Sequence, residues 1–340
     1  MSSGAIVAKS KTVFGSLLKK EDYMSLIYKG SVAGVVGYLK QKPRYKAVFA
    51  EINEAGLHRA QAEALIEQNV FDSYMRICRF AAGDKKGIMS FYIKKLEAEQ
   101  LIKAIIAVSS GGQERFFGNL PPYLMDKLSF DAEEAARAKT MRELLIVIEK
   151  TPYYKALYPV LSEDKPDMET AALAVNCCYI KWAFSKLQSS VKGKARDRLK
   201  SFFLRKADLD NLLLCYRLRV NFSLEPEEIE KLLIPYHYRL NINEIDEALR
   251  APDPVSELKK LFVNKKLAVN INRKDDCPEL GAGAMNYRFF RHRLALSENE
   301  TEALYSLMVL FETEAMNIYR IIEGVRYGLP PEEIEKYIII

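Results

Sequence analysis

The chain has 340 residues, of which 49% are hydrophobic and 28% charged, and it carries a net charge of +6. This composition is typical of a soluble globular protein whose length allows one large core or two ordinary ones. No apolar run approaches the 18 residues of a membrane span, and the N-terminus lacks the features of a secretory signal. We therefore expect a cytoplasmic protein, which at this modest charge permits but does not require an acidic partner.

The first third of the chain predicts two helices. An apolar helix ends at Pro43, within LKQKPRYKAVF. A long helix follows, with apolar positions three and four residues apart and a stop at Gly111–Gly112. Its apolar positions are Met89, Ile93, Leu96 and Ile105. The sequence LPPY then occupies Leu120–Tyr123.

The middle third repeats this order. Pro152 lies in IEKTPYYKALY, and a long helix then ends before Asn221, a residue that tolerates the left-handed conformation. The apolar positions of this helix are Phe202, Leu209, Leu213, Tyr216 and Val220. The hexapeptide PEEIEK follows at Pro226–Lys231, and IPYHY follows at Ile234–Tyr238. Proline at the first helical position, with acids behind it, is a common way to begin a helix.

The last third has the same parts again. Pro252 ends an apolar helix, a long amphipathic helix stops before Gly328, and PEEIEK recurs at Pro331–Lys336. The apolar stripe of the long helix is Leu304, Leu307, Phe311, Ala315, Ile318 and Ile322. Alternating segments with hairpin turns are absent from the sequence, so we expect an all-α fold.

The three long helices also align in their polar residues. Gln100, Asn211 and Asn317 occupy one equivalent position, and an acid stands three residues before each amide: Glu97, Asp208 and Glu314. We interpret the chain as three similar helical units of roughly 110 residues, a self-similarity typical of repeat architectures. The units are residues 1–118, 119–233 and 234–340, and the segments expected to superpose are 35–112, 144–233 and 244–340. Three such units favour a closed arrangement about a pseudo-threefold axis, with a central opening.

Catalytic and metal-binding motifs are scarce. The sequence has no GxxxxGK[ST] phosphate cradle, its three histidines lie far apart, and no nucleophile and base can be paired. We interpret Gly281–Gly283 and the acid pair Asp275–Asp276 as loop residues. The five cysteines form no Cys-x-x-Cys pair, and we expect buried reduced thiols. We expect no catalytic residue, no cofactor and no metal site.

Two basic stretches are the candidates for binding a partner. One begins a predicted helix after residue 191, and the other lies in NYRFFRHRLA. The candidate residues are Lys192, Lys194, Arg196, Arg198, Lys200, Arg288, Arg291 and Arg293. A solvated helix face is the first interpretation, an acidic protein partner or anionic lipid surface the second, and nucleic acid the last, because no nucleic-acid-binding signature is present.

The C-terminal pattern N-x-x-x-I-x-x-G-x-x-x-G-L-P-P-E-E-I-x-x-Y-I, at Asn317–Ile338, resembles the end of the central-stalk subunit of V-type rotary ATPases. This is the C subunit of the archaeal and bacterial enzymes and the d subunit of the eukaryotic ones. YKGSVAGVVGYLKQKPRYKAVF, LLIVIEKTPYYKALYPVL and LIPYHYRLNINEIDEAL resemble other parts of the same family. The resemblance covers essentially the whole chain. The first unit departs from the pattern, because QERFFGN replaces the Pro-Glu-Glu start.

The resemblance implies a non-catalytic, all-helical funnel that couples ATP hydrolysis or synthesis to proton or sodium transport. Its partners would be the central shaft subunits and the membrane proteolipid ring. It would associate with the membrane peripherally, through protein and without insertion, and would not bind nucleic acid. The alternatives are a helical scaffold unrelated to rotary ATPases and an all-α enzyme.

Overall fold

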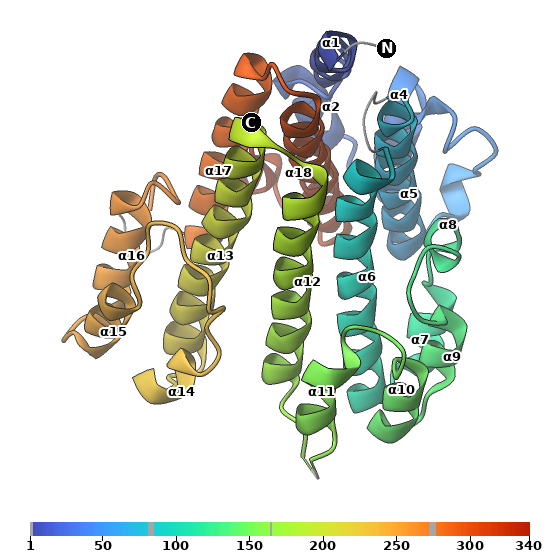
Figure 1. Cartoon of the computed structure of the whole chain (residues 1–340). Coiled ribbons are helices and arrows are strands. Elements are labelled where there is room, and N and C mark those ends of the chain that lie inside the picture. Colours follow the sequence, from blue (N-terminus) through green and yellow to red (C-terminus); the bar gives the residue numbers. More distant parts are fainter. Residues whose placement is uncertain (1–2, 81–84, 164, 272–276) are drawn as a thin grey trace. The chain divides into compact units, whose positions relative to one another are not determined.

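The computed structural model describes residues 3–80, 85–163, 165–271 and 277–340 (Figure 1). Every regular element within these ranges is helical, and no strand occurs in them. The predicted all-α fold is confirmed. None of the described helices combines the length and the apolar character that crossing a lipid bilayer requires.

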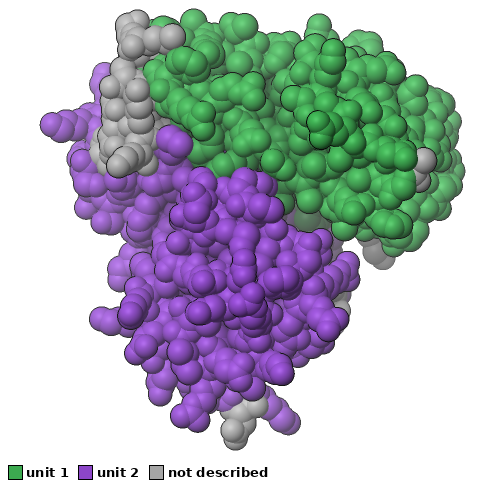
Figure 2. Space-filling model, turned by 90° about the vertical axis from the view of Figure 1, so that its right-hand side faces the viewer, with its two compact units in different colours: residues 1–88, 268–270, 275–340 green, residues 89–267, 271–274 purple. Residues whose placement is uncertain are grey.

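The chain folds as two compact units, which Figure 2 distinguishes by colour. Unit 1 comprises residues 1–88, 268–270 and 275–340, so it joins the beginning of the chain to its end, and unit 2 comprises residues 89–267 and 271–274. The helices of unit 1 are α1 (Ser3–Phe14), α2 (Lys20–Ile27), α3 (Val32–Lys40), α4 (Pro43–Lys46), α5 (Arg59–Cys78), α17 (Pro278–Leu296), α18 (Glu300–Arg326) and α19 (Pro331–Glu335), with the short 3-10 helix η1 (Glu54–Gly56).

Helix α18 forms the centre of unit 1. It begins at a cap in which the Asn299 side chain accepts hydrogen bonds from the N–H groups of Thr301 and Glu302, at 2.9 and 3.2 Å. It packs against α1, α2, α3, α5, α17 and α19. All six residues of its predicted apolar stripe are buried, and each of the five larger side chains, all but that of Ala315, contributes about 1.5–3 kcal/mol to stability.

The end of α18 shows how the chain turns into the last short helix. Gly328 takes a left-handed φ of +66°, as the sequence predicts. The second PEEIEK then begins α19 with proline at its first position. Ile334 of this helix packs against Gly324, where an added Cβ would lie 2.6 Å from the Ile334 Cγ1 atom. The close approach therefore requires glycine at position 324.

Unit 2 contains three long helices and several short ones. The described helices are α6 (Lys85–Ser110), which begins at the end of unit 1, α7 (Gln113–Gly118), α8 (Pro122–Met125), α9 (Ala132–Arg137), α10 (Met141–Val147), α11 (Tyr154–Leu161), α12 (Met168–Ser190), α13 (Gly193–Asn221), α14 (Pro226–Glu230), α15 (Ile242–Arg250) and α16 (Pro254–Asn264). Helices α12 and α13 lie side by side (Figure 1). An aromatic cluster joins them to α6, with the Phe91 ring 5.5 Å from Trp182 and 5.7 Å from Phe203.

The buried face of α13 differs from the predicted one. Val220, assigned to the apolar stripe, is 40% exposed, whereas Leu212, Cys215 and Leu218 are buried. The polar side chain of Asp208 is also buried. Residues 212–216 are all apolar, so three- and four-residue spacing fits either face of the helix and does not decide which one is buried.

Three local predictions need correction. Asn221 is still helical, and Ser223 takes the left-handed φ of +54° in its place. Gly281–Gly283 lies inside α17 instead of a loop, because Pro278 begins that helix upstream. Of the five thiols expected to be buried, Cys277 is exposed and Cys177 and Cys178 are half-buried, whereas Cys78 and Cys215 are buried. The Asp275–Asp276 pair lies outside the described residues.

Candidate functional site

A buried carboxylate in the middle of α18 holds the beginning of the chain. Glu314 is 2% exposed, and its Oε2 accepts a hydrogen bond from the Leu18 N–H at 2.5 Å. Arg44 Nη1 and the Tyr45 hydroxyl donate to Oε1 at 2.7 and 2.8 Å. Burial, followed by the charge of Glu314, raises the pKa of Tyr45, so its hydroxyl stays protonated and able to donate. A carboxylate can be buried here because these donors replace water.

The equivalent acid of α6 makes a similar attachment. Glu97 is 2% exposed, and it accepts hydrogen bonds from the Ser129 N–H at 2.7 Å and from the Ser129 hydroxyl at 3.0 Å. Lys94, one turn earlier, forms an ion pair with it. Burial, followed by the neighbouring Glu97 charge, raises the pKa of Tyr153, which follows the second repeated proline. Glu97 therefore fixes the segment that leads into α9.

The equivalent acid of α13 relies on backbone donors. Asp208 is 1% exposed and accepts hydrogen bonds from three consecutive N–H groups, those of Tyr238, Arg239 and Leu240, at 2.9, 2.8 and 3.2 Å. These residues lead directly into α15. All three predicted acids are thus buried, and each binds the backbone of a segment that leads into a helix.

The repeated amides make a second kind of attachment. The Asn211 side chain donates from Nδ2 to the Ile234 carbonyl at 3.0 Å and accepts from the Ile234 N–H at 2.8 Å. The Asn317 side chain makes the same pair of bonds to Ile339, at 2.7 and 2.9 Å. Gln100, the third predicted member, is 2% exposed. The segment that follows PEEIEK is therefore held in the same way at both copies of the hexapeptide.

The first basic stretch lies at the start of α13, in unit 2. Lys192 precedes the helix as its cap, and the other predicted residues of this stretch occupy its first two turns. All five are exposed: Lys192, Lys194, Arg196, Arg198 and Lys200. Exposed cations at a helix N-terminus are opposed by the helix dipole, so the helix itself does not explain them.

The second basic stretch lies on α17, in unit 1. Arg288 and Arg291 are exposed. Arg293 is half-buried, lies 3.6 Å from the buried Glu302 of α18 and stacks over the Phe289 ring at 5.6 Å. Arg293 therefore has an internal role in neutralising Glu302, whereas the other two cations face outward.

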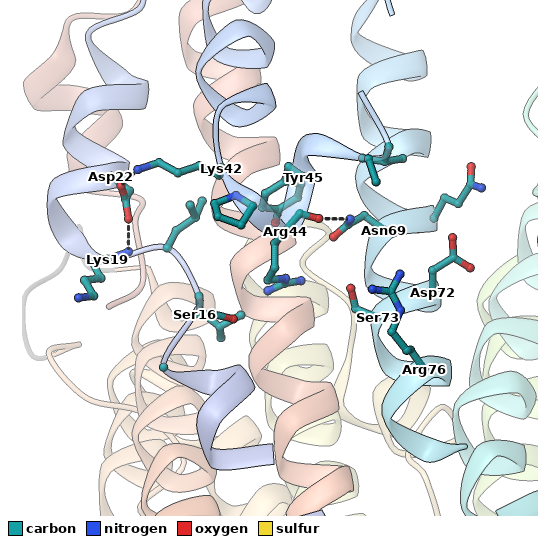
Figure 3. A pocket seen from close by; sticks show the side chains of 17 residues that line it. Ser16, Lys19, Asp22, Lys42, Arg44, Tyr45, Asn69, Asp72, Ser73 and Arg76 are labelled. Carbon is teal, nitrogen blue, oxygen red and sulfur yellow. Dashed lines mark hydrogen bonds and ion pairs between the residues drawn. The ribbon is translucent and has the colours of Figure 1, made fainter. Parts of the chain in front are cut away.

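Unit 1 also contains a pocket of about 670 Å³ between α2, α4 and α5 (Figure 3). Its charged lining residues are Lys19, Asp22, Lys42, Arg44, Asp72 and Arg76. Partial burial alone would raise the pKa of Asp22, but hydrogen bonds from the Lys19 N–H and from Lys42 outweigh this effect and hold the pKa below its usual range. The repeat carries no signal for this pocket, because position 44 is not repeated: Tyr153 and Asp253 follow the other two prolines.

A comparison with protein-family models shows the family to which the chain belongs. The ATP synthase (C/AC39) subunit family matches residues 6–337. The chain belongs to this family. Among the described residues of this family member, no cluster of three or more histidines, cysteines and acids could hold a metal ion.

Curated relatives agree with this assignment. The chain is 23% identical to the C subunit of the A-type ATP synthase from Archaeoglobus fulgidus, over 98% of this chain and 95% of that protein. It is 24% identical to the protein of the same name from Methanocaldococcus jannaschii, over 92% of this chain and 80% of that protein. A third relative of this name, from Methanosphaera stadtmanae, is 22% identical over 75% of this chain and 64% of its own length. This C/AC39 chain is therefore similar along its whole length to subunits of archaeal ATP synthases.

Proposed function

We propose that this chain is the non-catalytic central-stalk adaptor of a rotary ATPase. It links the rotating shaft to the membrane proteolipid ring, and so couples ATP hydrolysis or synthesis to proton or sodium transport. Its family and its relatives, which are subunits of A-type ATP synthases, support this proposal. The same match disfavours the alternative of a helical scaffold unrelated to rotary ATPases.

The observation that carries the proposal is the repeated attachment of long helix to loop. Glu97 binds a segment about 30 residues later in the chain, and Asp208 does the same. Glu314 binds Leu18, at the beginning of the chain. The third attachment returns to the first residues, as a closed ring of three units requires.

The three repeat units expected from the sequence, which differ from the two compact units of the fold, are residues 1–118, 119–233 and 234–340. We propose that they are arranged about a pseudo-threefold axis as a funnel with a central opening. The shared core of α18 with α1 and α2 supports this closure, because it joins the third unit to the first. A torque-transmitting part must not fray, and a closed ring leaves no terminal unit with a free face. The chain associates with the membrane through the ring subunits, without insertion.

The exposed cations are the partner-binding residues of this proposal. They are Lys192, Lys194, Arg196, Arg198 and Lys200 on α13, and Arg288 and Arg291 on α17; Arg293, the remaining candidate, supports its stretch from inside through Glu302. Charges of this kind steer acidic partner surfaces and fix their register more than they set affinity. Binding should therefore fall with salt, since the screening length shrinks from about 10 Å at 0.1 M to 3 Å at 1 M ionic strength.

The test is binding of the full chain to purified shaft subunits and to the purified ring, in low and in high salt. Arg196→Glu with Arg198→Glu reverses the α13 stretch, and Arg288→Glu with Arg291→Glu reverses the α17 stretch. Lys155→Glu, on an exposed face of α11, is the matched control. We expect each double reversal to weaken one partner at least tenfold and the control to weaken neither. Failure of the unaltered chain to bind either partner in low salt contradicts the adaptor role, whereas binding that ignores the reversals contradicts only the placement of the contacts.

A further inference from the structure

Two of the long helices end in the same exposed arrangement. Phe222 caps the C-terminus of α13, and Tyr327 caps that of α18. The next residue in each case takes a left-handed φ, which is +54° at Ser223 and +66° at Gly328. Phe222 is 60% exposed and Tyr327 is 64% exposed. An aromatic side chain therefore projects into solvent at the same point of both helices.

A short acidic helix follows each of these aromatic residues. Residues 222–230, which include α14, contain four acids and no cation, and residues 327–335, which include α19, contain three acids and no cation. We call these two segments the aromatic corners. Each corner combines an exposed aromatic ring with negative charge.

Nearby cations neutralise only part of this charge. Within the described part of the chain, the cations that form ion pairs with corner acids are Arg219 and Arg250 at the first corner and Lys336 at the second. Two cations thus face four acids, and one cation faces three. Arg326, beside the second corner, pairs with Glu323 outside it. A surplus of negative charge therefore remains at each corner.

The fold itself does not require these aromatic residues. The long helix of the first repeat, α6, also ends before a left-handed glycine, Gly111, but the residue in the aromatic position is Ser110. The short helix that follows, α7, contains one acid, Glu114, with Arg115 beside it. A long helix of this chain can therefore end without an exposed ring. Since apolar surface in water is unfavourable and aromatic residues are enriched at interfaces, the two exposed rings indicate a binding surface.

In unit 2 the aromatic corner and the basic stretch lie at opposite ends of one helix. The basic residues Lys192–Lys200 lie at the start of α13, and Phe222 lies at its end. The helix has 29 residues, a length of about 43 Å. Figure 1 shows α14 at the end of α13 that lies away from the turn between α12 and α13.

Unit 1 has the same polarity. Helices α17 and α18 run antiparallel, because Arg293 lies 3.6 Å from Glu302 and the Phe290 ring lies 5.7 Å from that of Tyr305. The exposed cations of α17 therefore lie beside the first part of α18, whereas Tyr327 lies at its end. Each unit, taken by itself, carries positive charge near the start of its long helix and an acidic aromatic surface at the end.

We propose that the aromatic corners bind the cytoplasmic loops of the proteolipid ring and that the basic stretches bind the shaft. This inference rests on the adaptor role proposed above and assigns its two partners to different ends of the long helices. Cytoplasmic loops of membrane proteins carry an excess of lysine and arginine. Such cations are attracted both to carboxylates and to the face of an aromatic ring. A ring of identical subunits offers the same loop repeatedly, which explains why two repeats carry the same corner.

Binding of the full chain to the purified ring and to purified shaft subunits tests the assignment. The double variant Phe222→Ser with Tyr327→Ser gives both corners the residue that the first repeat has there. We expect it to weaken ring binding at least tenfold and to leave shaft binding unchanged. Val263→Ser, which removes a 42% exposed apolar side chain of α16, is the control and should change neither. Helix content by circular dichroism verifies folding.

Charge variants test the electrostatic part of the proposal. Glu332→Lys with Glu335→Lys reverses two exposed acids of the second corner. It should weaken ring binding severalfold in low salt and less in high salt, because exposed charges are screened by salt. Arg196→Glu with Arg198→Glu, at the other end of α13, should weaken shaft binding and leave ring binding unchanged.

The outcomes distinguish this assignment from the adaptor role. Unaltered chain that binds neither the ring nor the shaft contradicts both. Ring binding that survives Phe222→Ser with Tyr327→Ser in a folded chain overturns the assignment and leaves the adaptor role intact. Loss of shaft binding in that variant, or loss of self-association of the chain, assigns the corners to another partner and overturns it too.

Discussion

The side-chain amide of Asn317 binds both backbone groups of Ile339, with its Nδ2 2.7 Å from the carbonyl oxygen and its Oδ1 2.9 Å from the N–H. Asn211 binds Ile234 in the same manner. Each pair is buried, so it replaces two hydrogen bonds that water would otherwise make. The segment after each PEEIEK copy is therefore held with the same geometry.

Removing the amides should destabilise the protein unequally. Asn211→Ala leaves the N–H and the carbonyl of Ile234 buried and unpaired in mid-chain, which costs about 2–4 kcal/mol of unfolding free energy. Asn317→Ala should cost less, about 1–2 kcal/mol, because the C-terminal residues can detach and regain water. Urea unfolding measures both changes.

Hydrogen exchange distinguishes local detachment of the C-terminal residues from a loss of stability of the whole chain. Asn317→Ala should speed hydrogen exchange at Ile339 and its neighbours and leave α14 protected. Asn119→Ala is the control, since the exposed Asn119 side chain bonds only a carbonyl one turn before it. Unchanged stability in both amide variants contradicts their structural role.

Glycine at position 324 should be replaceable only with a matching change in its neighbour. Gly324→Ala places a methyl group against Ile334 and should cost about 1–3 kcal/mol, the range for overpacking. Adding Ile334→Val trims the facing side chain and should recover part of this loss. Gly37→Ala, inside α3 with no atom within 4 Å of the new Cβ, should instead stabilise the chain by about 0.5–1 kcal/mol. Thermal unfolding of the unaltered chain and of these three variants measures the differences in stability. Equal effects of alanine at the two glycines contradict the packing of α19.

The cysteines should react with disulfide reagents in a fixed order. Burial raises the pKa of Cys78 and of Cys215 to about 12, so these thiols should react only when the protein unfolds. Cys277 is exposed, but partial burial of its thiol and the hydrogen bond of the thiol to Glu279 raise the pKa of this cysteine too. A raised pKa means less thiolate at a given pH, so its labelling rate should still be rising above about pH 9.

Glu279→Gln tests the cause of that shift. It removes the negative charge beside the Cys277 sulfur, which lies 3.1 Å from Glu279 Oε2. The pKa of Cys277 should fall, and labelling at pH 8 should become about two to five times faster, since reactivity follows the thiolate fraction. Glu298→Gln, exposed beyond the end of α17, is the control. A slower or unchanged rate in Glu279→Gln contradicts the electrostatic cause.

The purified chain should neither hydrolyse ATP nor bind it tightly. Its sequence contains no phosphate cradle of the GxxxxGK[ST] type, in which backbone N–H groups surround the phosphates. Calorimetry with ATP and magnesium measures this, and micromolar affinity contradicts the prediction.

Much of the fold follows from the sequence because helices are specified locally. Apolar spacing placed the three long helices, and the position of Gly328 gave the end of α18. The sequence alignment of the long helices also matched Glu97, Asp208 and Glu314. In the structure each of these acids binds the backbone of a segment that leads into a helix. The buried face of α13 was predicted wrongly, because residues 212–216 are all apolar and their spacing fits either face. The bonds of Asp208 to Tyr238 and its neighbours belong to the true buried face, and such tertiary bonds leave no periodic signal.

The pocket of unit 1 could not be predicted for a related reason. Arg44 and Asn69 lie on different helices, and their relation appears only when the Asn69 amide reaches the Arg44 carbonyl. The residue after the repeated proline differs among the three repeats, so comparing them does not single out Arg44. The basic stretches were visible as sequence, but only the structure distinguishes the outward-facing Arg291 from Arg293, which is paired with Glu302.

Coupled ion transport tests whether this chain connects the shaft to the ring, as proposed above. The rotary complex is assembled in vesicles with and without the chain, and ATP hydrolysis and ion uptake are measured together. We predict that hydrolysis persists without the chain while ATP-driven ion uptake is lost, and that adding the purified chain restores uptake. Full ATP-driven ion uptake in vesicles that lack the chain would contradict the account.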